Sequence, residues 1–224
     1  MKIKVIITGA TGMVGEGVLI ASLQHPDVES VLIINRRPSG VVHPKLKEII
    51  HTDFSNISSI ADQVTGYDAC FFCLGVSSIG LNEEKYTLLT YTLTLGFAKT
   101  LAEANLNSLT FCYISGAGTD STEKGKSMWA RVKGKTENDL SKLPFKKVYN
   151  FRPGGLKATK GQKHVLSYYK YFSWLIPILQ TLTPNFVSTL QDLGLAMIKV
   201  TINGYPKQIL EVKDINSLGK SITY

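Results

Sequence analysis

A chain of 224 residues, 44% of them hydrophobic, is long enough to bury one sizeable core and to form a single domain. Its 25 Lys and Arg residues against 17 Asp and Glu residues give a formal net charge of +8, which attracts anions in general. The basic residues occur in pairs along the chain, such as Arg36 and Arg37, and the absence of a longer basic tract argues against a nucleic-acid partner.

The three cysteines, Cys70, Cys73 and Cys112, do not form a disulfide framework, and their odd number favours a reducing compartment. The first two have the C-x-x-C spacing of some metal and redox sites. They lie in an apolar run that is typical of a buried strand, whereas a metal knuckle or redox turn would lie on a loop or a helix start. We therefore expect core cysteines and no metal. The stretch before residue 8 is too short for a signal peptide, so we expect a cytoplasmic location.

Short β-branched runs alternate with helical patterns along the first half of the chain, which is typical of successive βαβ units. Right-handed crossovers then place helices on both faces of a parallel sheet. The sequence therefore predicts an α/β, doubly wound, mainly parallel sheet of Rossmann type in a single domain over residues 1–224. The expected strands are 3–8, 30–35, 47–51, 68–74, 108–114, 147–151 and 208–211, and the expected helices are 14–24, 57–64, 82–104, 127–143 and 190–200.

The pattern loosens after Gly154, where Gly161, Pro177 and Pro184 interrupt it. We predict that residues 155–187 form a small C-terminal lid region that walls the substrate site. Its most apolar part, residues 168–182, is shorter than the roughly 20 apolar residues that span a bilayer. We interpret it as a helix over the substrate cleft, with contact to a membrane surface as the less favoured alternative.

The segment from Gly9 to Gly15 has the spacing Gly-x-x-Gly-x-x-Gly between the first expected strand and the first expected helix. In this context the backbone N–H groups and the helix N-terminus face a pyrophosphate, and the missing Cβ atoms allow close approach. A tight turn without a ligand is the alternative. We predict a dinucleotide site that includes Gly9, Thr11, Gly12, Met13, Val14 and Gly15.

The second expected strand ends in Asn35, Arg36 and Arg37. In an enzyme that prefers NAD(H), an Asp or Glu at this place binds the ribose 2′-hydroxyl. A planar guanidinium instead suits a 2′-phosphate by charge and by bidentate geometry. The sequence therefore predicts NADP(H) as the preferred cofactor and NAD(H) as the alternative, and it leaves open which arginine contacts the phosphate.

Two further pairs of residues follow strands at the carboxyl edge, where ligands of such sheets bind. Asp53 and Phe54 follow the third expected strand, and Leu74 and Gly75 end the fourth. We expect Asp53 to accept from the adenine amine, unless its side chain only caps the following turn. We expect Gly75 to let the backbone pass the adenosine ribose.

Five segments together resemble the atypical short-chain dehydrogenase/reductases. The most similar branch is the Tat-interacting-protein-like, NAD(P)-binding one, often labelled nucleoside-diphosphate-sugar epimerase-like. The resemblance covers nearly the whole chain and implies a Rossmann fold with a nicotinamide cofactor, but no particular reaction. The segments are residues 8–15, 35–37, 114–117, 132–137 and 151–154.

The resemblance also implies a catalytic trio, in which a Ser or Thr orients the substrate oxygen and a Tyr transfers the proton. A Lys four residues later binds the nicotinamide ribose and lowers the Tyr pKa. Ser115 and Lys133 match the first and third members, and we predict both as catalytic residues, with a plain turn residue as the alternative for Ser115. Trp129 occupies the Tyr position, and its indole N–H has no acidity near neutral pH. We predict Trp129 as a substrate-site residue that packs against the nicotinamide or a flat substrate, or else as a core residue.

The remaining candidates complete the nicotinamide end of the site. Pro153 and Gly154 resemble the family's segment beside the nicotinamide carboxamide, and a strand-ending turn is the alternative. Replacement proton donors are suggested by residue type alone at Tyr86, Tyr91 and Tyr113.

Two functions follow. The first is an NADP(H)-dependent oxidoreductase or epimerase-like enzyme that acts on a small carbonyl or alcohol substrate. The second, motivated by Trp129, is a catalytically impaired NADP(H)-binding protein whose ligand state regulates a protein partner.

Overall fold

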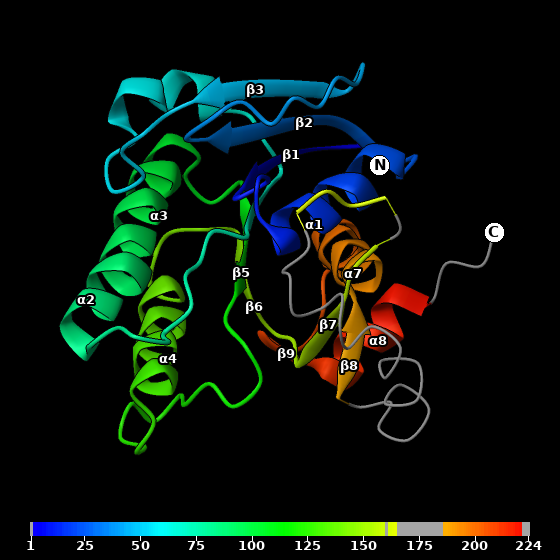
Figure 1. The fold of residues 1–224 in the computed structure, drawn as a ribbon. Helices are drawn as coiled ribbons and strands as arrows, with labels where there is room; N and C mark the ends of the chain where they lie inside the picture. Colours follow the sequence, from blue (N-terminus) through cyan, green and yellow to red (C-terminus); the bar gives the residue numbers. More distant parts are fainter. Residues whose placement is uncertain (1, 160, 165–185, 221–224) are drawn as a thin grey trace.

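Seven strands, all paired in parallel, form the central sheet of the computed structural model, which describes residues 2–159, 161–164 and 186–220 (Figure 1). Their order is β3-β2-β1-β4-β5-β6-β9, so the chain moves outward from β1 first on one side and then on the other. The carboxyl ends of β1 and β4 therefore flank the topological switch point, where ligands of such sheets bind. The strands are β1 Ile3–Thr8, β2 Val28–Asn35, β3 Leu46–Ile50, β4 Ala69–Phe72, β5 Thr110–Ile114, β6 Lys147–Arg152 and β9 Ile209–Glu211.

Helices cover both faces of this sheet (Figure 1). One face packs against α1, α7 and α8, and the other against η1, α3 and α4, so that two separate apolar clusters form the core. The predicted doubly wound fold is confirmed, and all seven expected strands occur within two residues of the expected ends. The helices are α1 Met13–Gln24, η1 Ser58–Val64, α2 Glu83–Thr87, η2 Leu88–Thr92, α3 Leu93–Ala104, α4 Met128–Leu140, α7 Leu190–Asn203 and α8 Val212–Lys220.

Several expected elements differ from the structure. The helix expected over 82–104 is interrupted by a π-helical turn, η2, and the segment expected as a helix over 57–64 is a 3₁₀ helix. Helix α4 ends at Leu140, three residues early. The sequence did not predict α8 or the small parallel sheet of β7 (Gly155–Lys157) and β8 (Val187–Thr189). Three-residue strands are too short to show an alternating pattern.

Of the expected lid region, residues 160 and 165–185 lie outside the described residues, and with them the segment considered for a membrane surface. Its described beginning lies against the start of α1. The side chain of Gln162 donates to the backbone oxygen of Met13 at 2.7 Å, and the buried carboxylate of Glu16 accepts from the backbone N–H of Lys163 and of His164. Within the described residues, no helix is long and apolar enough to cross a membrane.

Helices α1 and α7 approach each other closely through glycines. A Cβ atom on Gly17 would lie 2.6 Å from the Cβ of Leu190, and one on Gly194 would lie 2.6 Å from the Cβ of Ala21. Real Cβ atoms do not approach so closely, so the two glycines permit this contact. The position of α1 against the sheet, and with it the turn that precedes α1, depends on this fit.

The cysteines belong to the core, as expected. Cys70 on β4 and Cys112 on β5 are fully buried, and Cys73 lies just beyond the end of β4. Burial raises the pKa of all three thiols, so none of them is an activated thiolate.

Candidate cofactor and active site

The glycine turn has the geometry that its spacing predicts. Gly9 adopts a φ of +69°, which favours glycine, and a Cβ atom on Gly15 would lie 2.1 Å from the backbone oxygen of Gly9. Gly12 is the N-cap of α1 and has no side chain to cap the first turn. The free N–H groups of that turn, in Met13 and Val14, therefore suit an anion, while Thr11 is exposed beside them.

A cavity of about 320 Å³, called the adenosine cavity below, lies next to this turn at the carboxyl edge of the sheet. Five predicted site residues line it together, although they come from three separate loops. Its remaining walls come partly from η2 and α3, which the sequence did not assign to the site. The residues are Arg36, Asp53, Phe54, Leu74 and Gly75, with Thr52, Ser55, Val76, Leu88, Leu89, Thr92 and Leu93.

Asp53 and Phe54 have defined surroundings. The Oδ1 atom of Asp53 accepts from the backbone N–H and the hydroxyl of Ser55, which is the capping alternative considered from the sequence. These hydrogen bonds lower the pKa of Asp53 and keep it ionised. Phe54 is buried and stacks on Phe97 with ring centroids 5.9 Å apart, which fixes one wall of the cavity.

The residues at the end of β2 divide into three environments. Asn35 is buried, Arg36 lines the adenosine cavity, and Arg37 is exposed outside the cavity lining. Of the two arginines, Arg36 is therefore the one at the cavity wall.

Lys133 and Trp129 lie one turn apart on α4, beside the loop that follows β5. The ammonium of Lys133 donates to the backbone oxygen of Ser115, and burial lowers its pKa to about 8, against the attraction of Glu137. The ring of half-buried Trp129 covers the loop: a Cβ atom on Gly118 would lie 3.5 Å from it. Lys133 and Trp129 thus both contact the loop that follows β5, and Trp129 presents an indole at the position where the resemblance implies a tyrosine.

Ser115 is buried and its hydroxyl is engaged inside the protein. It donates to Oε1 of Glu137 at 2.5 Å, and the same carboxylate accepts from Nε and Nη2 of Arg152. Arg152 also donates to the hydroxyl of Ser121. Because a hydroxyl has one proton, Ser115 has only lone pairs left for a substrate in this arrangement.

Sequence reasoning missed Glu137 and Arg152, although both lie in segments that carried the family resemblance. Because their sequence neighbours include other polar and charged residues, no local pattern marked Glu137 and Arg152 as a buried pair.

The segment after β6 lies beside the same loop. The backbone oxygen of Pro153 accepts from the N–H of Ala117 at 2.8 Å. Gly154 allows close approach of the chain before β8, since a Cβ atom there would lie 2.3 Å from the backbone oxygen of Phe186. Pro153 therefore lies next to the loop that bears Ser115, and Gly154 next to the chain before β8.

The three tyrosines considered as proton donors all have a raised pKa. Burial raises the pKa of Tyr113 on β5 and of Tyr86 on α2. Tyr91 donates to Asp139 at 2.8 Å, which contributes with burial to a raised pKa. None of the three is poised to give up a proton near neutral pH.

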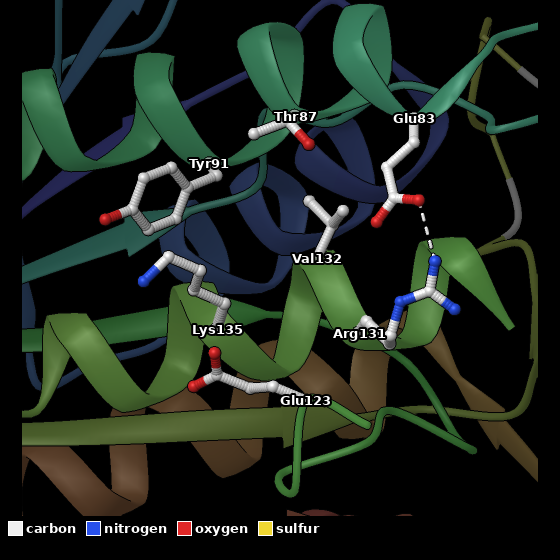
Figure 2. Close-up of a pocket in the computed structure, with 7 residues that line it drawn as sticks. All are labelled: Glu83, Thr87, Tyr91, Glu123, Arg131, Val132 and Lys135. Carbon is white, nitrogen blue, oxygen red and sulfur yellow. Dashed lines mark hydrogen bonds and ion pairs between the residues drawn. The ribbon is translucent and has the colours of Figure 1, made fainter. Parts of the chain in front are cut away.

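Tyr91 lines a second, smaller cavity of about 140 Å³ between α2, η2 and α4 (Figure 2). The ammonium of Lys135 lies 4.9 Å from the Tyr91 ring centroid, and Arg131 forms an ion pair with Glu83 at 2.7 Å. Of its charged residues, Arg131 and Glu83 pair with each other, whereas Lys135 pairs with Asp139 outside the lining.

Comparison with solved structures supports the fold. A short-chain dehydrogenase family protein from Francisella tularensis superimposes with a TM-score of 0.64 over 91% of this chain and 93% of its own, at 17% identity. A UDP-N-acetylglucosamine 4-epimerase from Methanobrevibacter ruminantium superimposes with a TM-score of 0.66 over 97% of this chain and 81% of its own, at 14% identity. The predicted Rossmann-type architecture is that of these enzymes.

Curated relatives correct one expectation. The fmp52 protein of Emericella nidulans is 31% identical over 157 residues, which are 67% of this chain and 65% of that protein, or just under two thirds of its length. FMP52 of Debaryomyces hansenii is 28% identical over 160 residues, 70% of this chain and 69% of that protein. Both are named as mitochondrial proteins. The expected cytoplasmic location is therefore wrong.

The predicted resemblance is confirmed by a family model. The model described as the NAD dependent epimerase/dehydratase family matches residues 5–127, which include the glycine turn and all loops that line the adenosine cavity. Its match exceeds half of the chain, and the fold and the glycine turn agree with it. The chain belongs to the NAD-dependent epimerase/dehydratase family, within the short-chain dehydrogenase/reductase type of Rossmann fold.

Proposed function

We propose that this protein binds NADP(H) and acts as an oxidoreductase or epimerase-like enzyme on a small carbonyl or alcohol substrate. One observation carries the choice of cofactor. At the end of β2, where an enzyme that prefers NAD(H) has a carboxylate for the ribose hydroxyl, the side chain that lines the adenosine cavity is the cation Arg36. A guanidinium binds a 2′-phosphate with both charge and fork geometry.

The residues present suit the whole length of such a cofactor. The uncapped start of α1 would hold the pyrophosphate, and Asp53, Phe54, Leu74 and Gly75 would enclose the adenosine. Lys133, Pro153 and Gly154 would hold the nicotinamide end. The bound cofactor supplies or accepts a hydride.

Lys133 has a further role in this proposal. Its pKa of about 8 lies close to neutral pH, so the ammonium can give up a proton in the working range without losing most of its positive charge at pH 7. Trp129 contributes apolar surface over the same loop and no proton.

A second candidate is a protein that binds NADP(H) but turns over little or no substrate and instead regulates a protein partner. The observation that favours it is the combination of Trp129 at the Tyr position with a Ser115 hydroxyl already donated to Glu137. Two members of the trio then lack a proton to give.

The test begins with fluorescence titrations of NADPH and NADH, for which we expect tighter binding of NADPH. The loaded protein is then incubated with a panel of aldehydes and ketones while NADPH oxidation is followed by absorbance. Equal affinity for the two cofactors would contradict the cofactor choice. A folded, NADPH-loaded protein that oxidises no NADPH, but captures a partner only when loaded, would establish the second candidate instead.

A further inference from the structure

The carboxylate of Glu48 binds both ends of the turn that carries the two arginines. Glu48 lies on β3, which pairs in parallel with β2. Its Oε1 atom accepts a hydrogen bond from Nδ2 of Asn35 at 2.9 Å and another from the backbone N–H of Ser39 at 2.9 Å. Asn35 ends β2 and Ser39 follows Pro38, so a single oxygen atom closes the turn of residues 36–38.

The turn itself is exposed, and its conformation decides where its two guanidinium groups lie. Arg36 lines the adenosine cavity and Arg37 does not. Among the ion pairs of the described residues, none involves either arginine. Arg36 therefore lines the cavity without an ion pair to any of the described residues.

The amide of Asn35 is fixed in one orientation by this contact, because a carboxylate only accepts hydrogen bonds and must face Nδ2. Asn35 is 2% exposed, and its Oδ1 atom has no hydrogen-bond partner among the described residues. An unpaired buried acceptor is costly and uncommon. The protein bears this cost and keeps the contact with Glu48, which indicates that the turn is held for a functional reason.

We propose that Glu48 is a positioning residue for cofactor choice, which holds the turn of residues 36–38 so that the Arg36 guanidinium meets the 2′-phosphate of NADP(H). This inference rests on the proposed function and deepens it. The selecting element would then be shared between two strands: the cation comes from the end of β2, and the carboxylate that places it comes from β3.

The charge of Glu48 acts in the opposite direction, because a carboxylate near a phosphate repels it. Two substitutions separate positioning from repulsion. Glu48→Gln removes the charge but keeps an oxygen that can accept both hydrogen bonds. Glu48→Asp keeps the charge but shortens the side chain by one methylene, which withdraws the oxygen from Asn35 and Ser39.

The experiment is a fluorescence titration of NADPH and NADH with the wild-type, E48Q and E48D proteins. We expect E48D to weaken NADPH binding by about tenfold and NADH binding by less than about threefold, since only NADPH uses the Arg36 contact. E48Q should stay within about threefold of wild type for both cofactors. Glu29→Ala, which removes an exposed carboxylate at the opposite end of β2, is the control and should change neither affinity.

Three results would overturn the inference and leave the proposed cofactor intact: tighter NADPH binding by both variants, unchanged binding by E48D, or equal weakening of NADPH and NADH by E48D. The first would show that repulsion dominates, the second that the turn needs no support, and the third that Glu48 only stabilises the fold. A wild-type protein that binds NADH as tightly as NADPH would instead overturn the proposed cofactor, and this inference with it.

Discussion

The hydroxyl of Ser115 and the carboxylate of Glu137 form a hydrogen bond of 2.5 Å beneath the loop that follows β5. Arg152 binds both oxygens of the same carboxylate, so the buried charge of Glu137 is compensated by one cation and one hydroxyl. This cluster joins the residue after β5, the last turn of α4 and the end of β6. It therefore supports the loop after β5, beside which Lys133 and Trp129 lie on α4.

Glu137→Gln should lower the free energy of unfolding by about 3 kcal/mol, because it leaves the Arg152 guanidinium buried without its main counter-charge. Urea unfolding measures this loss. The matched control is Lys142→Ala, which breaks an ion pair with Asp139 at a side chain that is 73% exposed and should cost less than about 1 kcal/mol. Equal losses in the two variants would contradict a special role for the buried cluster.

Lys133 should make stability depend on pH above neutrality. Burial lowers its pKa from the ordinary 10.5 to about 8. Between these pH values the unfolded chain holds a proton that the folded protein has released, so the contribution of Lys133 to stability rises with pH. Below pH 8 the Lys133 ammonium is charged in both states, and the folded protein bears the full cost of burying that charge.

The wild type should therefore gain up to about 3 kcal/mol relative to Lys133→Met across this window, measured by urea unfolding of both proteins at each pH. Parallel pH profiles would show that the ammonium is hydrated in the folded protein.

Arg36→Glu should weaken NADPH binding by more than about tenfold and NADH binding much less, because it replaces the proposed phosphate partner with a repelling charge. The matched control is Arg37→Glu, which reverses the same charge one residue outside the cavity lining. Fluorescence titration gives the four affinities. A larger loss of NADPH affinity in the Arg37 variant would contradict the assignment of the phosphate contact to Arg36.

Trp129→Tyr should raise NADPH-dependent reduction of carbonyl compounds, because it restores a phenol next to Lys133, whose ammonium lowers the pKa of a neighbouring tyrosine. NADPH affinity should change little. Trp129→Phe is the control, since it makes a similar change in size without a hydroxyl. Equal rates for the Tyr and Phe variants would mean that the substituted residue does not reach the substrate.

Gly15→Ala should abolish NADPH binding and destabilise the fold, because the added Cβ would lie 2.1 Å from the backbone oxygen of Gly9. Gly75→Ala separates the two effects, since nothing of the described protein lies within 4 Å of its added Cβ. It should melt like the wild type and bind NADPH less tightly. Unchanged NADPH binding by Gly75→Ala would place the adenosine away from this loop.

The sequence predicted the sheet and the geometry of the glycine turn well because both depend on local patterns. The glycines of the turn and the apolar runs of β1, β2 and β4 are each readable from neighbouring residues. Glu48, Glu137 and Arg152 were missed because their roles arise from partners 9 to 31 positions away, brought together only by the fold. The π-helical turn from Leu88 to Thr92 was missed because one extra residue in a turn barely changes a helical pattern.

The close contact of α1 with α7 also bears on how the chain can be divided. The family model ends at residue 127, but Gly17 is fitted to Leu190 and Gly194 is fitted to Ala21. A fragment that stops at residue 127 would carry the cofactor turn and all loops of the adenosine cavity, yet it would expose the apolar surface of α1 that α7 covers. We therefore expect that the part of this chain that matches the family model does not fold on its own, and that transplanting it requires the late helix as well.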